Sequence, residues 1–203
     1  MHKLKITEMN RLNVEEFKQV KKIPLIVVLD DVRSLHNVGS VFRSSDAFRV
    51  EAIYLCGITA TPDEVRDADG TLLRDCTLKA SQEIHKTALG AEQSVAWRYF
   101  KNAAAAVEQL HNDGYEVLAV EQCHGSTMLN DFCPDAAKKY AVVLGNEVKG
   151  VHQEVIDKCD GCLEIPQYGT KHSLNVSVTA GIIIWHFAQQ NARCSSQFTI
   201  HNS

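Results

Sequence analysis

The sequence predicts an α/β fold with a mostly parallel sheet flanked by helices. Short apolar runs of strand length alternate along the chain with segments of helical pattern, which is typical of this class. The run over 25–29 is apolar on both faces, as in strands buried within a parallel sheet. A chain of 203 residues has the size of a single domain. We therefore expect one α/β domain.

The first quarter of the chain predicts a helix, a strand, a second helix and a second strand. Asn13 can cap a helix, and Glu16 stands three residues later, as in a capping box. This helix is expected to end near Lys22, before Pro24. The expected elements are a helix from 14 to about 22, a strand over 25–29, a loop over 30–37, a helix from about 39 to 48 and a strand over 52–55.

The rest of the chain continues the alternation after one long interruption. The segment 58–83 is polar and contains Pro62 and the pair Asp69-Gly70, so we expect a long surface loop there. Asn102 and Gly114 suit the two ends of a helix between them. The expected elements are strands over 95–100, 115–120, 140–144 and 162–165, helices over 102–112, 151–158 and 176–190, and a helical turn over 134–139.

Composition and charge limit the classes of protein. The formal net charge of −4 by itself disfavours a nucleic-acid binder. Residues 1–24, however, hold six Lys or Arg against three acidic residues, so they carry +3 and the remainder carries −7. No apolar run approaches the length of a membrane span, and the charged N-terminus does not resemble a signal peptide. We expect a cytoplasmic protein with a short basic helical extension over 1–24, a main domain over 25–190 and a tail over 191–203.

Seven cysteines occur without a disulfide framework, which is consistent with reduced thiols. Cys159 and Cys162 form a C-x-x-C pair that could be half of a zinc site or a redox pair. No second pair has the spacing to complete a zinc site, so we expect no metal and no redox role for this pair.

Three polar loops follow predicted strands and carry the candidate chemistry, because ligands of open α/β sheets bind beyond the carboxyl ends of strands. The first loop, 30–43, contains Asn37 and Gly39, and a helix starting there would point free N–H groups at an anion such as a phosphate. The second, 145–150, has a glycine at each end, which indicates a tight turn. The third, 166–177, has more polar residues before the last helix than an N-cap needs.

Two common nucleotide-binding patterns are missing. The glycine at 150 is followed by Val151 and not by Lys-Ser or Lys-Thr, so the second loop is not a triphosphate-binding loop. The pattern G-x-G-x-x-G occurs nowhere, which disfavours a dinucleotide-binding fold.

Together the loops resemble the motifs of the SpoU (TrmH-like) family of RNA 2′-O-methyltransferases, in the SPOUT superfamily. All three motifs occur in order, each after a predicted buried strand, and the resemblance covers about residues 25–188. They match Asn37-Val38-Gly39-Ser40-Val41-Phe42-Arg43, then Gly145-Asn146-Glu147-Val148-Lys149-Gly150, then Ile165-Pro166 with Gly169 and Ser173-Leu174-Asn175-Val176-Ser177.

The resemblance implies a SPOUT-type methyltransferase domain whose C-terminal part forms a deep trefoil knot. It implies S-adenosyl-L-methionine as the methyl donor and a homodimer in which the partner subunit completes the site. The residues that would bind the donor are Val120, Leu144, Gly145, Asn146, Gly150, Ile165, Pro166, Ser173 and Leu174.

The resemblance also implies that Arg43, Asn37, Glu147, Ser173 and Asn175 form the catalytic site. Arg43 would act either as general base or as a cation that holds a phosphate or the developing alkoxide; a neutral arginine would need a very large pKa shift. Asn37 would support Arg43 or the target ribose. Glu147 would orient the site by hydrogen bonds or by pairing with an arginine. Ser173 and Asn175 would shape the donor pocket and the substrate side.

The expected partner is RNA. Only about 24 residues precede the first strand, too few for a separate RNA-binding domain, so we favour tRNA over rRNA. The residues expected to contact RNA are His36, Arg43, Lys86, Lys18, Lys21 and Lys22, the last three in an extension that could lie beside the motif loops. Two other functions remain as alternatives, a non-catalytic RNA-binding module on the same scaffold and a nicotinamide-dependent oxidoreductase.

Overall fold

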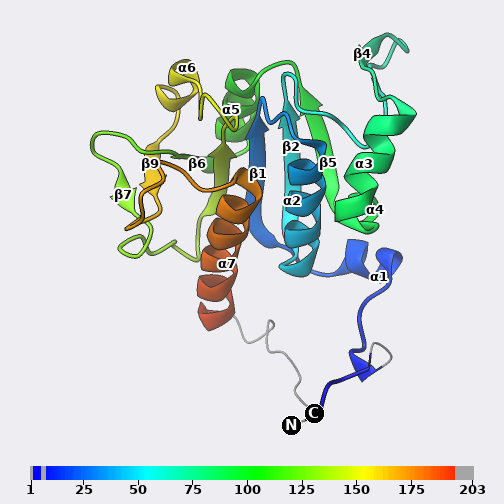
Figure 1. Ribbon diagram of the computed structural model, residues 1–203, viewed down its shortest axis with the longest axis horizontal. Helices are drawn as coiled ribbons and strands as arrows, with labels where there is room; N and C mark the ends of the chain where they lie inside the picture. Colours follow the sequence, from blue (N-terminus) through cyan, green and yellow to red (C-terminus); the bar gives the residue numbers. More distant parts are fainter. Residues whose placement is uncertain (1, 6–7, 195–203) are drawn as a thin grey trace.

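A seven-stranded parallel sheet forms the centre of the computed structural model, which describes residues 2–5 and 8–194. Its strands are β1 (Ile23–Asp30), β2 (Val50–Cys56), β5 (Ala96–Phe100), β6 (Tyr115–Val120), β7 (Thr127–Met128), β8 (Lys139–Leu144) and β9 (Gly161–Glu164). They lie in the order β5-β2-β1-β8-β6-β9-β7, and every pair in this sheet is parallel (Figure 1). The predicted α/β class is confirmed.

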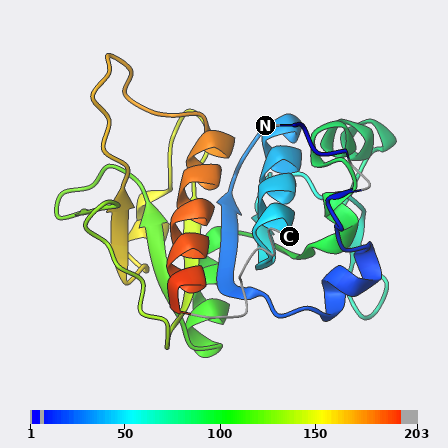
Figure 2. The same ribbon diagram turned by 90° about the horizontal axis from the view of Figure 1, so that it is seen from below.

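Helices cover both faces of the sheet, and β1 shows why its sequence is apolar throughout. Leu25, Val27 and Leu29 point to one face, where they pack with α2 (Leu35–Ala47) and α7 (Val176–Cys194). Ile26 and Val28 point to the other face, where α5 (Ala103–Asn112) and α6 (Gln153–Ile156) contribute to a second core. Figure 2 shows α2 and α7 side by side, next to β1. A central strand buried on both faces needs apolar residues at every position.

The capping box before α1 (Val14–Gln19) is confirmed. The Asn13 side chain accepts from the Glu16 amide at 2.9 Å, and the Glu16 carboxylate accepts from the Asn13 amide at 2.8 Å. The helix ends at Gln19 and not near Lys22, because β1 already begins at Ile23. Pro24 therefore lies inside β1, where the pairing with β2 is irregular and the pairing with β8 starts one residue later.

Helix α2 begins at Leu35, four residues earlier than expected. Ser34 is its N-cap and accepts from the Asn37 amide, so Asn37 lies within the first turn of the helix. Gly39 faces α3 (Leu78–Ala88): a Cβ there would lie 2.2 Å from the carbonyl oxygen of Ile84 and 2.2 Å from Thr87 Oγ1. The missing side chain thus allows the two helices to approach closely.

The expectation of a long loop over 58–83 is wrong in part. The segment contains a short hairpin, β3 (Val65–Arg66) and β4 (Leu72–Arg74), and the first turns of α3 (Figure 1). Thr77 caps α3 by accepting from the Ala80 amide at 3.1 Å. Only Ile84 and Ala88 of this helix are buried, so its apolar stripe is narrow, although the helix is amphipathic.

Most of the remaining predicted elements are present, with shifts at their ends. The strand β6 and the helix α5, capped by Asn102, are confirmed, whereas α4 (Ala91–Ser94) and β7 were not expected. The predicted helical turn over 134–139 is a non-helical turn, because β8 already begins at Lys139. The helix α6 is shorter than predicted, and α7 continues past 190.

Three expectations stand outside this description. Part of the expected tail, 195–203, lies outside the described residues. The domain boundaries and the trefoil knot stay predictions. Within the described part of the chain, no helix has the length and apolar character needed to cross a membrane.

We predict that Gly39→Ala destabilises the protein. The new methyl group would force α2 and α3 apart, and overpacking of this kind costs about 1–3 kcal/mol. Gly169→Ala in the exposed loop before α7 is the control, because a Cβ there meets nothing within 4 Å. It should change the free energy of unfolding by less than about 1 kcal/mol. Urea unfolding measures both changes, and equal effects of the two substitutions would contradict the assigned helix contact.

Candidate active site

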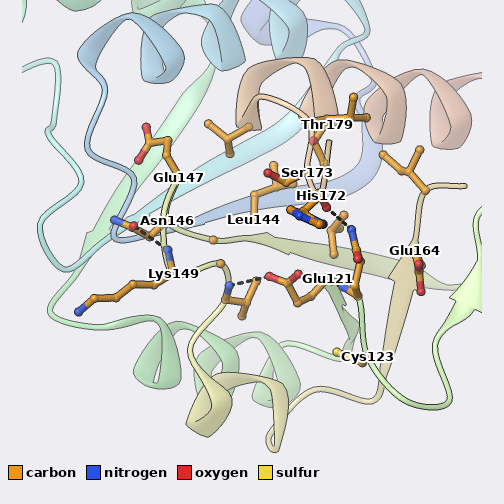
Figure 3. A pocket seen from close by; sticks show the side chains of 18 of the residues that line it. Glu121, Cys123, Leu144, Asn146, Glu147, Lys149, Glu164, His172, Ser173 and Thr179 are labelled. Carbon is orange, nitrogen blue, oxygen red and sulfur yellow. Dashed lines mark hydrogen bonds between the residues drawn. The ribbon is translucent and has the colours of Figure 1, made fainter. Parts of the chain in front are cut away.

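A cavity of about 970 Å³ lies at the carboxyl ends of β6, β8 and β9. This is the edge of a parallel sheet where ligands are expected to bind. Figure 3 shows Glu121, Leu144, Ser173 and Glu164 around it. Of the residues predicted to bind the donor, eight line the cavity and Pro166 does not: Val120, Leu144, Gly145, Asn146, Gly150, Ile165, Ser173 and Leu174.

The segment 145–150 forms the tight turn that its glycines predict. Asn146 and Gly150 exchange two backbone hydrogen bonds of 3.0 and 2.9 Å. The Asn146 side chain accepts from the amides of Val148 and Lys149 and donates to the carbonyl of Asp31, which fixes the turn to the end of β1. A Cβ at Gly145 would lie 2.1 Å from the backbone of Gly150, so the turn closes only with glycine there.

Glu147 lies at the tip of this turn and points toward α2 (Figure 3). Its carboxylate accepts from the backbone amides of Arg33 at 3.0 Å and Ser34 at 2.9 Å, and from the Asn37 side-chain amide at 3.0 Å. The anion expected at the N-terminal end of α2 is therefore a carboxylate of the protein itself. Burial raises the pKa of Glu147, but these hydrogen bonds outweigh burial and hold the pKa below its usual range.

Asn37 also forms a hydrogen bond with the third loop. Its side-chain oxygen accepts from Nδ2 of Asn175 at 3.2 Å. The Asn175 oxygen in turn accepts from the Ser177 amide at 2.9 Å and from the Ser177 hydroxyl at 2.6 Å, which makes Asn175 the N-cap of α7. The chain Glu147–Asn37–Asn175 thus joins all three predicted motif loops at the rim of the cavity.

Glu121 and Glu164 also line the cavity, and the sequence analysis did not find them. The Glu121 carboxylate accepts from the Val151 amide at 3.0 Å and from the Gln122 amide at 2.9 Å. It lies where a Cβ on Gly150 would be, since that atom would be 2.1 Å from Oε2 of Glu121. Glu164 accepts from the Ser126 hydroxyl at 2.7 Å. Their signal in the sequence is a carboxylate at the end of a buried strand.

The charge of the lining favours a small cation as ligand. The acidic side chains that line the cavity are those of Glu121, Glu147 and Glu164, and Lys149 is the one basic side chain besides histidines among the described lining residues. A formal charge of −2 disfavours the pyrophosphate of a nicotinamide dinucleotide and suits a ligand that carries a net positive charge. Val120, Leu144, Ile165 and Leu174 provide apolar surface next to these charges.

The predicted RNA contacts on α2 and α3 lie outside the cavity. His36 and Arg43 are seven residues apart, so they lie on one exposed face of α2. His36 contacts the Glu83 carboxylate at 2.7 Å, and Lys86 forms an ion pair with the same carboxylate. Arg43 does not line the cavity of its own chain. The residues predicted to contact RNA thus form two groups. His36, Arg43 and Lys86 are the group near the motif loops.

The other group, Lys18, Lys21 and Lys22, lies at the opposite edge of the sheet. These residues precede β1, whose eight residues span about 26 Å before the first motif loop begins. Lys22 donates to the carbonyls of Phe17 and Val20 and lies 3.8 Å from the centre of the Phe17 ring. Within one subunit, the basic extension does not lie beside the motif loops as expected.

Potential metal ligands were also located among the described residues. Asp30, Asp31 and His152 form one group close enough to share an ion. His152 Nδ1 lies 2.9 Å from an Asp30 oxygen, so these two side chains already form a hydrogen bond with each other. Cys162 contacts Cys123 and not Cys159, its C-x-x-C neighbour.

The geometry describes a parallel α/β protein with a small-molecule cavity at its strand ends and an interlocked polar rim. The model of the SpoU rRNA Methylase family matches residues 64–185, and the chain belongs to this family. The chain is 28% identical over 176 residues to the 23S rRNA (guanosine-2'-O-)-methyltransferase RlmB of Neisseria meningitidis, covering 86% of the chain and 62% of that protein.

Other relatives agree. A putative TrmH family tRNA/rRNA methyltransferase of Staphylococcus saprophyticus is 27% identical over 179 residues, 88% of the chain and 64% of the relative. The chain thus spans less than two thirds of the length of these curated relatives. The crystal structure of the A. aeolicus TrmH/SpoU tRNA modifying enzyme has a TM-score of 0.70 and 25% identity, covering 89% of this chain and 82% of that one.

We predict that Glu147→Gln destabilises the protein at neutral pH by about 1–3 kcal/mol, because an amide group cannot accept from all three donors. The folded-state pKa of Glu147 lies below its unfolded value, so its stabilisation is present above the unfolded pKa and is lost as pH falls through the folded pKa. The difference between wild type and variant should therefore shrink in acid.

Urea unfolding between pH 7 and pH 3 measures this difference. Glu154→Gln is the control, since Glu154 is exposed on α6. A constant difference across this range would show that the carboxylate does not hold the loops.

Proposed function

We propose that the chain is an S-adenosyl-L-methionine-dependent RNA 2′-O-ribose methyltransferase that acts on tRNA or rRNA in the cytoplasm. The observation that carries the proposal is the Glu147–Asn37–Asn175 connection, which brings the three motif loops together at the rim of the cavity. A non-catalytic RNA-binding module would need neither the donor cavity nor this rim. Membership of the family and the names of the relatives support the same function.

The cavity suits S-adenosyl-L-methionine. Its volume of about 970 Å³ lies within the range of small-molecule sites. The donor carries two positive groups and one carboxylate, so its net charge complements the −2 of the lining. Val120, Leu144, Ile165 and Leu174 would contact the adenine, and the turn at 145–150 would present backbone groups. Leu174 is 39% exposed without a ligand, so a bound donor would cover apolar surface.

The donor supplies a methyl group bound to a sulfonium, which the ribose 2′-hydroxyl attacks in line. The residues of the chain then have to position the hydroxyl and exclude water. Asn37, Glu147 and Asn175 direct most of their polar atoms at one another and at backbone groups, so we assign them the role of positioning residues. Ser173 lines the cavity with an exposed side chain and would contact donor or ribose directly.

Arg43 would act as a cation and not as a base. A guanidinium stays protonated in proteins, and a neutral arginine would need a very large pKa shift. A fixed cation can bind the neighbouring phosphate or stabilise negative charge on the 2′-oxygen as its proton leaves. Because Arg43 does not line the cavity of its own chain, we propose that a homodimer brings it to the cavity of the partner subunit.

The surface of α7 supports such a dimer. Val178 and Trp185 are 50% and 52% exposed and lie seven residues apart, so they present apolar surface on one face of this helix. Trp185 packs edge-on against Phe48, next to the C-terminal end of α2, at 5.4 Å between ring centres. Contact between two copies through α7 and α2 would bury this surface and place the Arg43-bearing helix at the interface.

We favour tRNA as the substrate. The A. aeolicus structure, which is 25% identical with a TM-score of 0.70, is described as that of a tRNA modifying enzyme. A nicotinamide-dependent oxidoreductase remains the alternative from another class, and the negative lining of the cavity disfavours it.

Two measurements test the proposed function. Calorimetry should detect binding of S-adenosyl-L-methionine and no binding of NADH, because the lining repels a pyrophosphate. Mass spectrometry of nucleosides from tRNA and rRNA, in cells with and without the gene, should show the loss of one 2′-O-methyl nucleoside from the tRNA fraction. Binding of NADH alone would overturn the proposal, and a loss confined to rRNA would overturn the choice of tRNA.

We predict that Arg43→Ala lowers the methylation rate at least about 100-fold, the usual effect of removing one group that stabilises developing negative charge. Binding of S-adenosyl-L-methionine should not change. The control is Arg66→Ala, since Arg66 is exposed on β3 and forms hydrogen bonds with nearby Glu64 and Gly70. A single-turnover assay on the tRNA substrate measures both variants, and near-normal methylation by Arg43→Ala would remove Arg43 from the mechanism.

A further inference from the structure

Two cysteines from different parts of the chain meet beside the cavity. Cys123 follows β6 and lines the cavity, and Cys162 lies on the neighbouring strand β9. Their Sγ atoms are 3.1 Å apart. Cys162 also donates to the carbonyl of Glu121 at 3.1 Å, and the Glu121 amide donates to the carbonyl of Leu163. The backbone around both thiols is thus held in place by hydrogen bonds across the two strands.

We propose that Cys123 and Cys162 are an oxidation site, at which a peroxide converts two thiols into a disulfide in the cavity wall. A disulfide has an S–S bond of about 2.05 Å, so the two sulfur atoms need to approach by only about 1 Å. The C-x-x-C spacing suggested a different partner, Cys159. In the structure Cys162 contacts Cys123 instead, 39 residues away in sequence.

The chemistry balances with hydrogen peroxide as oxidant. Cys123 attacks one peroxide oxygen, the O–O bond breaks, and the products are the sulfenic acid of Cys123 and water. The Cys162 sulfur then attacks the Cys123 sulfur, the S–O bond breaks, and the leaving hydroxide takes the Cys162 proton as a second water. Cys123 reacts first because it is the thiol that lines the cavity.

The environment of Cys162 makes this thiol slow to react with free peroxide, so it is not the thiol that is oxidised first. Burial, and then the contact with Cys123, raise the pKa of Cys162 to about 12, so this thiol stays protonated at neutral pH. Burial also raises the pKa of Cys159 to about 12. A buried, protonated thiol reacts slowly with free peroxide. Direct contact with Cys123 compensates for this, because the sulfenic acid forms within reach of Cys162.

The disulfide would connect two walls of the cavity. The residues that follow β6, Glu121 to His124, line one side, and Leu163 to Ile165 line the neighbouring side. A cross-link between them would fix the cavity in one shape. Conversely, a ligand in the cavity would cover Cys123 and protect it from peroxide; this second effect rests on the proposed function.

The test uses the full chain, reduced with dithiothreitol, desalted and treated with hydrogen peroxide. Free thiols are blocked with N-ethylmaleimide, and peptides are identified by mass spectrometry. We expect a Cys123–Cys162 linked peptide that dithiothreitol removes. Cys123→Ser and Cys162→Ser should each abolish it, and Cys162→Ser should instead accumulate a dimedone adduct on Cys123. A missing linkage, or a predominant linkage through Cys159, overturns the proposal.

Two matched controls and a ligand arm complete the test. Cys133→Ser changes an exposed cysteine and Cys159→Ser changes the C-x-x-C neighbour, and both variants should keep the linkage. Saturating S-adenosyl-L-methionine should slow disulfide formation several-fold. If the linkage forms at the same rate with this ligand, the proposed oxidation site is supported. The proposal that the methyl donor binds next to Cys123 is then overturned. The two failures are therefore distinguishable.

Discussion

One carboxylate holds the functional end of this molecule together. Glu147 lies on the turn after β8, yet its hydrogen bonds go to the chain after β1 and to the first turn of α2. Through Asn37 the same connection reaches the cap of α7. Three loops from distant parts of the sequence thus share one charged anchor. Hydrogen bonds to an ionised acceptor are roughly twice as strong as neutral ones, so Glu147 fixes the second loop to the first. The neutral hydrogen bond between Asn37 and Asn175 then joins the third loop to them.

This arrangement explains why small residues surround the anchor. Gly145 and Gly150 close the turn that presents Glu147, and a side chain on either would collide with the backbone or with Glu121. The same turn also forms one wall of the cavity. The cavity wall and the polar rim are therefore built from the same short segment. A change that loosens the turn would disturb both together, which ties the geometry of the cavity to the position of α2.

The sequence predicts those features whose cause is local. The capping box at Asn13, the strand over 115–120 and the tight turn between two glycines depend on a few neighbouring residues. The helix α3 was missed because its polar first turns follow directly on a segment with Pro62 and Asp69-Gly70, which together are typical of a loop. The role of Gly39 depends on that helix. In the site, the motif residues were found through the family resemblance. Glu121 was not, because its partner Val151 is 30 residues away.

The contacts of Glu83 have a consequence for the salt dependence of RNA binding. This carboxylate already binds both His36 and Lys86, which a phosphate of the RNA would otherwise bind. Under the proposed function, an incoming phosphate has to displace Glu83 and gains less than it would from a free lysine. Because Glu83 stays beside Lys86, the pair brings little net positive charge to the RNA. Few of the counterions condensed on the RNA are then released, so Lys86 adds little to the salt dependence of affinity. The surface would then exchange one RNA for the next readily, as repeated turnover requires.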